Sequence, residues 1–586
     1  MNGFTTRHLI LNLTADFEAH QLAGSVELHL DRSDTWATEL ALDTRALEIH
    51  SVETSTDAHP FAPTTFSLDA DDPAFGSPLR IAMPTGANRV RIRYTTSSLA
   101  KGLQWLTPEQ TAGRSHPFMF TQAEPIQARS FLPCQDTPSV RATFDATISV
   151  PPGLVVVMGA EATASDRERG VYTFHMPQPI PSYLIALAVG DLTFRPMSAR
   201  TGIWAEPVTV DAAAAEFEDT EAMIVETEAL YGPYRWGRYD ILVLPPSFPF
   251  GGMENPRLTF ATPTVITGDK SLVSLVAHEL AHSWSGNLVT NATWGDFWLN
   301  EGFTVYLERR IIESVYGKRR ADMDAVIALK DLAEARANIT VARDRTLQPD
   351  LTGRDPDDAY SIVPYEQGAL FLMWIESKVG RPAFDAFLRA WFDEHAFQSA
   401  TTAECLSFLR CRLLDQQPGV VSDAEIHEWL HSEGVPSFAV LPTSDAFECV
   451  AEVMRAWLGG DERALATEAT AWTTQEWMHF IDALPRNLPM AQMSELDTRF
   501  DLTRSRNAEI AHVWFRLAIA TKYEAAFAAM ERYLVSIGRR KFIVPIYRDL
   551  VVTPSGHALA ARIYAIARPG YHPLAQTTID ALVGVS

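Results

Sequence analysis

The spacing of apolar residues changes twice along the 586 residues of this chain, and this limits the folds that it can adopt. Up to about residue 190, apolar and polar residues alternate, as in 8–13, 25–30, 89–94 and 146–150. A period of two is typical of strands with one buried face. Clusters of Pro, Gly, Asp and Ser separate these runs, so the first part is predicted to be a β-sandwich or saddle.

The apolar spacing is helical towards the end of the chain. The stretches 490–502, 508–537 and 558–567 place apolar residues at i, i+3 and i+4. They predict stacked helical pairs that form a short α-solenoid, although no clean repeat is visible. Between the two parts the pattern is mixed, and residues 239–244 are typical of a buried strand.

A chain of this length is too long for one hydrophobic core. The fold class is therefore predicted to be multidomain α+β. We assign residues 1–192 to an N-terminal β domain, 193–434 to a mixed α/β domain, 435–446 with Pro436 and Pro442 to a linker, and 447–586 to a C-terminal α-helical domain.

Two histidines four residues apart carry the first sign of chemistry. On a helix, His278 and His282 project from one face, so both imidazoles can bind one metal ion. Apolar residues at helical spacing surround them, with Asp269 and Ser271 as predicted caps and Gly286 as a predicted stop. The alternative is a chance match to the pattern in a chain with 16 histidines.

A catalytic zinc ion needs a third protein ligand and one open position. Glu301 follows His282 after a gap of eighteen residues, in a stretch predicted to be a second helix that ends near Gly317. Glu279 lies directly beside His278, where a carboxylate can take a proton from water and pass it to a leaving nitrogen. Taken singly, each glutamate could instead be a solvated helix acid.

The pattern His-Glu-x-x-His, the eighteen-residue gap and the following Asn-Glu-Gly together resemble the gluzincin aminopeptidases of the aminopeptidase N family (M1). The resemblance implies one zinc ion per chain on His278, His282 and Glu301, with Glu279 as general base. It also implies that residues 193–434 form a thermolysin-like catalytic domain preceded by a β domain.

Two further segments resemble substrate-binding elements of that family. Gly251, Gly252, Met253 and Glu254 fit its Gly-x-Met-Glu-Asn motif, in which glycines let a peptide backbone approach closely. Glu254 would then bind the α-amine of the peptide. The resemblance gives Glu124 the role of a second amine anchor, contributed by the β domain. A glycine turn followed by a solvated glutamate is the alternative.

The resemblance also assigns Tyr365 as hydrogen-bond donor to the oxyanion formed on attack. Arg539 and Lys541 resemble the family segment that holds the terminal carboxylate of a peptide, with Arg539 as principal anchor. Their alternative is a solvated helix end. Within the family the similarity is to the leukotriene-A(4) hydrolase branch, in which residues matching Asp357 and Tyr360 serve a second activity, the opening of a lipid epoxide.

Two residues depart from that branch. Glu124 stands where the branch has an amide, which favours the amine of a peptide. Phe250 stands where it has a tyrosine, so the wall of the pocket differs.

Composition excludes several classes of partner. The formal net charge of −24 argues against binding to nucleic acid or to anionic membranes. Four scattered cysteines do not form a disulfide framework. No apolar run has the length of a secretory signal or a membrane span. We therefore expect a cytoplasmic monomer.

These observations predict a zinc aminopeptidase, a hydrolase that releases N-terminal residues from short peptides by attack of water activated at the zinc ion. One alternative is a lipid epoxide hydrolase at the same zinc. Another is a catalytically silent zinc-binding scaffold, against which the presence of both Glu279 and Tyr365 speaks. The preferred first residue, the longest peptide and the physiological substrate stay open.

Overall fold

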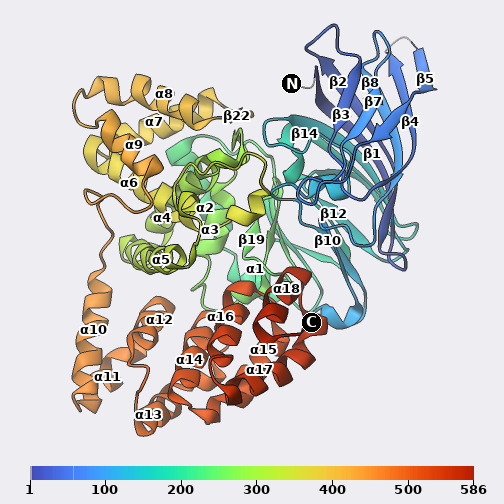
Figure 1. The fold of residues 1–586 in the computed structure, drawn as a ribbon. Coiled ribbons are helices and arrows are strands. Elements are labelled where there is room, and N and C mark those ends of the chain that lie inside the picture. Colours follow the sequence, from blue (N-terminus) through green and yellow to red (C-terminus); the bar gives the residue numbers. More distant parts are fainter. Residues whose placement is uncertain (1–2, 57–58, 586) are drawn as a thin grey trace.

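The computed structural model describes residues 3–56 and 59–585, and Figure 1 shows how their helices and strands are arranged. A β-rich N-terminal part (blue to cyan) lies beside a mixed part (green to yellow), and a helical part (orange to red) lies below them in this view. This succession agrees with the predicted multidomain α+β class.

The N-terminal part is built on a large mixed sheet with the strand order β13-β14-β11-β1-β2-β8-β4-β5. In β1, buried and less buried residues alternate, as expected for a strand with one covered face. β1 pairs antiparallel with β2 and parallel with β11. The strands are β1 (Phe4–Asp16), β2 (Gln21–Arg32), β4 (Glu48–Thr56), β5 (His59–Pro63), β8 (Arg89–Thr95), β11 (Arg141–Ser149), β13 (Glu161–Asp166) and β14 (Val171–Pro181).

Smaller sheets with the orders β12-β15-β10-β9 and β3-β7-β6 complete this part. Their strands are β3 (Glu39–Leu42), β6 (Phe66–Leu68), β7 (Leu79–Ala82), β9 (Leu103–Leu106), β10 (Phe118–Thr121), β12 (Val155–Met158) and β15 (Leu187–Gly190). The segment that follows β10 carries Glu124 and continues through the short helix Ala128–Ser130 to β11.

The mixed part contains a sheet with the order β16-β17-β18-β20-β19. β17, β18 and β20 are parallel, and the short β19 pairs antiparallel with β20 at the edge. β18 confirms the strand predicted at 239–244. The strands are β16 (Thr193–Pro196), β17 (Thr201–Ala205), β18 (Tyr239–Val243), β19 (Gly252–Met253) and β20 (Leu258–Ala261), with β21 (Val289–Asn291) and β22 (Gln398–Ala400) paired separately.

Helices surround this sheet, and α4 packs against both α3 and α6. The helices are α1 (Val210–Glu216), α2 (Thr220–Tyr231), α3 (Ser274–Ala281), α4 (Trp298–Tyr316), α5 (Lys318–Asn338), α6 (Gly368–Val379), α7 (Arg381–Glu394), α8 (Thr402–Arg412) and α9 (Asp423–His431). As predicted, α4 ends immediately before Gly317, whose φ of 89° suits glycine at the end of a helix.

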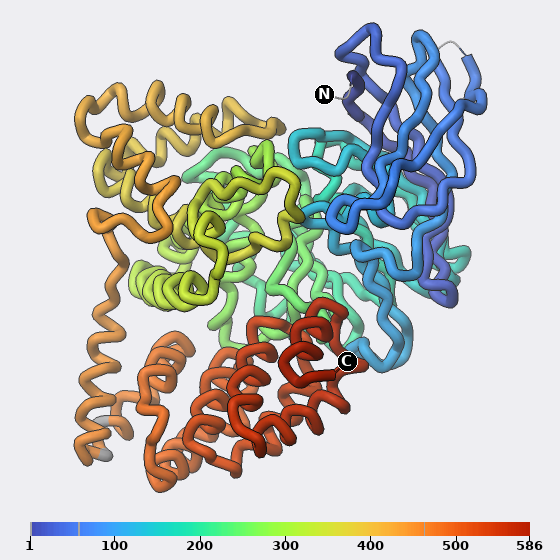
Figure 2. The backbone as a smooth tube through the Cα atoms, viewed as in Figure 1, coloured from blue at the N-terminus to red at the C-terminus, as the bar shows by residue number. Residues whose placement is uncertain are grey.

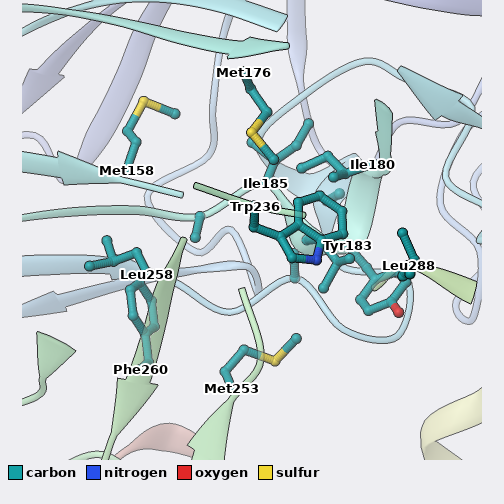
Figure 3. Packing of buried hydrophobic residues seen from close by; sticks show 14 of the residues in the cluster. Met158, Met176, Ile180, Tyr183, Ile185, Trp236, Met253, Leu258, Phe260 and Leu288 are labelled. Carbon is teal, nitrogen blue, oxygen red and sulfur yellow. The ribbon is translucent and has the colours of Figure 1, made fainter. Parts of the chain in front are cut away.

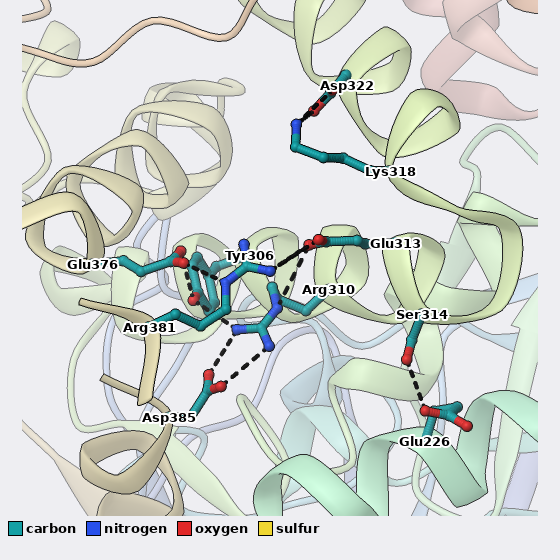
Figure 4. Close-up of polar contacts among 10 residues, drawn as sticks. All are labelled: Glu226, Tyr306, Arg310, Glu313, Ser314, Lys318, Asp322, Glu376, Arg381 and Asp385. Atoms are coloured by element: carbon teal, nitrogen blue, oxygen red, sulfur yellow. Dashed lines mark hydrogen bonds and ion pairs between the residues drawn. The ribbon is translucent and has the colours of Figure 1, made fainter. Parts of the chain in front are cut away.

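Ion pairs fix the C-terminal half of α4 to its neighbours (Figure 4). The buried Arg310 guanidinium binds both carboxylate oxygens of Asp385 on α7, at 2.6 and 3.2 Å. Tyr306 donates a hydrogen bond to Glu376 on α6. Arg381 also donates hydrogen bonds to Glu376 and to Glu313 on α4. These contacts stabilise the helix that carries Glu301.

The C-terminal part is helical, as predicted. The stretch 508–537 with helical spacing contains two helices, α14 and α15, and Lys522 adopts a left-handed conformation (φ 59°) between them. The predicted linker ends too late, since α10 already includes Asp445 and Ala446. The helices are α10 (Asp445–Leu458), α11 (Glu462–Glu468), α12 (Thr474–Ala483), α13 (Met490–Phe500), α14 (Ala508–Thr521), α15 (Phe527–Ser536), α16 (Arg540–Leu550), α17 (Pro554–Ala567) and α18 (Pro573–Val583).

Buried apolar side chains form one continuous cluster through the β-rich and mixed parts and a separate cluster in the C-terminal helices. Figure 3 shows the first cluster where the two parts meet: Met176 and Tyr183 from the β side lie near Trp236 and Leu288 from the mixed side. The β-rich part is thus a rigid support for residues that it contributes to the site.

The C-terminal helices also touch the β-rich part (Figure 2). The side chain of Gln110 donates a hydrogen bond of 2.6 Å to the carbonyl of Pro569. Within the described ranges, none of the helices is both long and apolar enough to cross a membrane.

Candidate metal centre and active site

The predicted metal ligands converge at one point. His278 lies in α3, and His282 follows that helix with dihedral angles that are still helical (φ −57°, ψ −22°). Their Nε2 atoms are 3.2 Å apart. Glu301, in the first turn of α4, places its Oε2 at 3.4 Å from His278 Nε2 and 3.7 Å from His282 Nε2.

The predicted ends of the first helix are wrong. The residue at its N-terminal cap is Val273, without a side-chain cap, because Asp269 instead accepts the backbone N–H of Ser271 in the preceding turn. The helix ends at Ala281, before Gly286. Gly286 has a φ of 97°, and a Cβ there would lie 2.2 Å from the amide oxygen of Asn300. It permits close approach to α4 and does not stop the helix.

The second nitrogen of each imidazole is also bound. His278 Nδ1 donates to Glu308 Oε2 at 3.0 Å, and His282 Nδ1 donates to the carbonyl of Ser285 at 3.2 Å, with Thr304 Oγ1 at 3.1 Å. Such contacts orient histidine ligands and direct Nε2 towards the metal. Glu308 was not predicted from the sequence, although it lies seven residues, or two helical turns, after Glu301 and thus on the same face of the helix.

The donor set fits a zinc ion. Ligand atoms around tetrahedral zinc with bonds of about 2.0 Å lie about 3.3 Å apart, close to the separations found here. Burial lowers the pKa of His282 to about 4, so its imidazole is neutral, as a ligand must be. Glu301 Oε2 is buried without a hydrogen-bond partner in the described part of the chain, which leaves it free for a cation.

Glu279 is buried beside this centre, and its position depends on Gly252. A Cβ at Gly252 would lie 2.2 Å from Glu279 Oε1, so only glycine fits there. The other oxygen, Oε2, is buried and has no hydrogen-bond partner among the described residues. Burial raises the pKa of the Glu279 carboxyl, and nearby carboxylates raise it further. Such a group can hold a proton during a reaction.

The two predicted amine anchors lie together. Oε1 of Glu124 and Oε1 of Glu254 are both buried without hydrogen-bond partners in the structure as described. Burial raises the pKa of both carboxyls, to about 7 for Glu254, where Glu301 adds to the effect. Unpaired buried carboxylates are costly unless a cation neutralises them. Zinc and a peptide ammonium group would supply such cations.

Tyr365 lies in a π-helical turn, Val363–Gln367, that precedes α6. Its ring is nearly parallel to that of His278, with centroids 6.1 Å apart. Its hydroxyl is 3.2 Å from that of Tyr360, which is 59% exposed. Burial raises the pKa of Tyr365, so the phenol stays protonated and can donate a hydrogen bond.

Asp357 accepts a hydrogen bond from Gln127 at 3.2 Å.

Arg539 reaches the site from the C-terminal part. Its guanidinium lies so close to Gly251 that a Cβ there would be 2.9 Å from Nη2. It donates to Thr264 Oγ1 at 3.3 Å. Backbone hydrogen bonds position the segment: Gly538 N–H donates to the Pro246 carbonyl at 2.8 Å, and Arg540 N–H to that of Pro249 at 3.0 Å.

Lys541 differs from expectation, because it is already paired. Its ammonium lies 2.5 Å from Oε1 of the buried Glu509, on α14. Glu509 was not identified from the sequence, because no local sequence pattern relates a residue on α14 to Lys541 on α16. Of these two cations, Arg539 is therefore the one that remains available to a ligand.

One cavity of about 810 Å³ collects these groups. Its volume is in the range of small-ligand sites. It is lined by all the predicted site residues: Glu124, Gly251, Gly252, Met253, Glu254, His278, Glu279, His282, Glu301, Asp357, Tyr360, Tyr365, Arg539 and Lys541. Phe250, the position that departs from the hydrolase branch, also lines it.

A mixed sheet beside a His-Glu-x-x-His helix, with a glutamate ligand on the next helix, is the arrangement of a gluzincin-type metallopeptidase. Family models agree. The Peptidase M1 N-terminal domain matches residues 5–184, the Peptidase family M1 domain matches 215–424, and the leukotriene A4 hydrolase C-terminal domain matches 472–583. The chain belongs to peptidase family M1 and is a zinc metallopeptidase, a hydrolase, as predicted.

Similar proteins extend over the whole chain. It is 36% identical to leucine aminopeptidase 2 of Neurospora crassa, covering 100% of this chain and 89% of the relative. It is 37% identical to leukotriene A-4 hydrolase of Xenopus laevis, covering 98% and 97%. The solved structure of yeast LTA4 hydrolase with bestatin superposes with a TM-score of 0.92 at 33% identity, covering 100% of this chain and 96% of that one.

Proposed function

We propose that this enzyme removes N-terminal residues from short peptides, with one zinc ion per chain held by His278, His282 and Glu301. The proposal is supported most directly by two buried carboxylates, Glu124 and Glu254, which have oxygens without hydrogen-bond partners among the described residues and line the same cavity as the three metal ligands. A free α-amine neutralises them, whereas the interior of a long chain does not. An exopeptidase needs this distinction, because the held amine sets the distance from chain end to metal.

Zinc, when bound, polarises the scissile carbonyl and lowers the pKa of water. Glu279 takes the proton of the attacking water on its unpartnered Oε2 and delivers it to the leaving nitrogen. Tyr365 donates its phenolic hydrogen to the oxyanion that forms. Edge strand β19, which contains Gly252 and follows Gly251, can pair with the backbone of an extended peptide.

The amine anchor is tested by Glu254→Gln. Because the ammonium is held both on binding and during attack, we expect KM to rise and kcat to fall together. A hydrogen bond between charged groups contributes about 1.5–3 kcal/mol, which corresponds to about 10- to 100-fold in kcat/KM. Steady-state kinetics on an aminoacyl fluorogenic amide measure this.

N-acetylated peptides are the control, since the unaltered enzyme should not cleave them. Efficient cleavage of an acetylated peptide would show an endopeptidase and would remove the anchor role from Glu254.

At the other end of the cavity, Arg539 is proposed to hold the terminal carboxylate of a short peptide by paired hydrogen bonds. We expect tripeptides with a free carboxylate to be cleaved faster than their amides. Arg539→Ala should abolish this preference, mainly through a higher KM for the acid, with unchanged zinc content.

The matched control is Arg548→Ala, which removes the same charge from an exposed residue of α16 that does not line the active-site cavity. This variant should keep the preference for the acid. An equal loss on acids and amides in Arg539→Ala would instead indicate that Arg539 only positions the domains.

A further inference from the structure

A second cavity, of about 570 Å³, lies where the mixed part meets the C-terminal helices, and we call it the seam cavity. It is lined by Pro246, Pro263, Thr264 and Ile266 from one side and by residues between 503 and 537 from the other. It shares no lining residue with the active-site cavity. The short helix Pro263–Val265 separates them, since Thr264 lines the seam cavity and Val265 the active site.

The seam cavity has a cationic side. Arg504, Arg506 and Arg532 line it, and within the described part of the chain no Asp or Glu does. Arg504 lies 3.9 Å from the exposed Asp501. The exposed guanidinium groups of Arg506 and Arg532 form no hydrogen bond or ion pair with any other described residue, although Arg532 interacts electrostatically with the adjacent Glu531. In a chain with a net charge of −24, this concentration of unpaired guanidinium groups favours an anion.

The opposite side is apolar. Phe515 and Ala529 are buried, and Pro263, Ile266 and Ile537 extend the apolar wall. The polar groups that line the cavity are mostly occupied elsewhere: Tyr533 donates to the Ala508 carbonyl, and Thr503 donates to Asp497. An occupant would therefore bind through apolar contact and through the arginines.

We propose that the seam cavity binds an amphipathic organic anion, with a carboxylate head on Arg506 and Arg532 and an aliphatic body against Phe515 and Ile266. Arginine suits such a head because its planar guanidinium can donate two parallel hydrogen bonds to a carboxylate. The volume is that of a small-molecule site. This proposal does not depend on the peptide substrate proposed above.

The test is calorimetric titration of decanoate, below its micelle concentration, into the zinc-loaded full-length enzyme. We expect saturable binding, with affinity lowered at least about tenfold in Arg506→Gln/Arg532→Gln, because two charge-assisted hydrogen-bond partners are lost. The charge-preserving Arg506→Lys/Arg532→Lys should retain more affinity than the glutamine pair. Decanol, which lacks the charge, should not bind.

The matched control is Arg548→Gln, which removes an exposed arginine of the same domain that does not line the cavity. It should bind decanoate as the unaltered enzyme does. The proposal is overturned if decanoate does not bind, or if the glutamine pair binds it with unchanged affinity. Loss of binding in Arg539→Ala with full binding in the glutamine pair would place the ligand in the active-site cavity and would also overturn it.

Discussion

Glu279→Gln is expected to lower kcat for peptide cleavage by about 10²- to 10⁴-fold, the usual contribution of general acid–base catalysis, with zinc content unchanged. The amide has nearly the same shape as the carboxylate and fits over Gly252, but it cannot accept the proton of water. Because the ligand atoms belong to His278, His282 and Glu301, the metal should stay bound. Turnover of an aminoacyl fluorogenic amide and elemental analysis measure the two quantities.

The control is the Gln variant of an exposed carboxylate that lies outside the cavity, Glu394, which pairs with Arg412 on the surface. It should keep full turnover. Normal turnover in Glu279→Gln would exclude proton transfer by this residue. Loss of zinc together with activity would instead show that Glu279 supports the metal site.

Tyr365→Phe is expected to lower kcat by about 10²- to 10³-fold, as the loss of one oxyanion donor does in other hydrolases. KM should change little, because the oxyanion exists only after attack. The ring remains and can still lie against His278, so neither fold nor zinc content should change. Steady-state kinetics on the same amide give both parameters.

Tyr360→Phe is the matched control, since it removes the hydroxyl that lies 3.2 Å from that of Tyr365. A reduction in kcat of only a few fold is expected, because Tyr365 can donate without this neighbour. Equal losses in both variants would assign the effect to the pair and not to Tyr365 alone.

The sequence predicted those parts of the site that depend on helical spacing. Two histidines four residues apart must share a face of a helix. The positions of Glu254, Tyr365 and Arg539 instead came from the resemblance to the family. The structure brings all of them into one cavity.

Contacts between distant segments could not be predicted from local pattern. Glu509 neutralises Lys541 from another helix, and no periodicity relates the two. The predicted start of the helix that carries His278 was wrong, because the Asp269 carboxylate accepts the backbone N–H of Ser271 and does not cap the helix. The continuous core of the β-rich and mixed parts could not be predicted either. An apolar residue in the sequence indicates burial but does not indicate which element packs against it.

The docking of Gly538 and Arg540 onto Pro246 and Pro249 has a consequence for how these peptidases diverge. Backbone atoms form both hydrogen bonds, so most side-chain substitutions in either loop leave the register intact. Gly538 is an exception, because a Cβ there would lie 2.8 Å from the carbonyl oxygen of Ser247. Insertions do not, because each added residue can displace the loop by up to about 3.5 Å, the span of one residue in an extended peptide. Relatives should therefore change amino-acid preference by point substitution in the pocket, but should change the permitted peptide length by insertion or deletion at this joint.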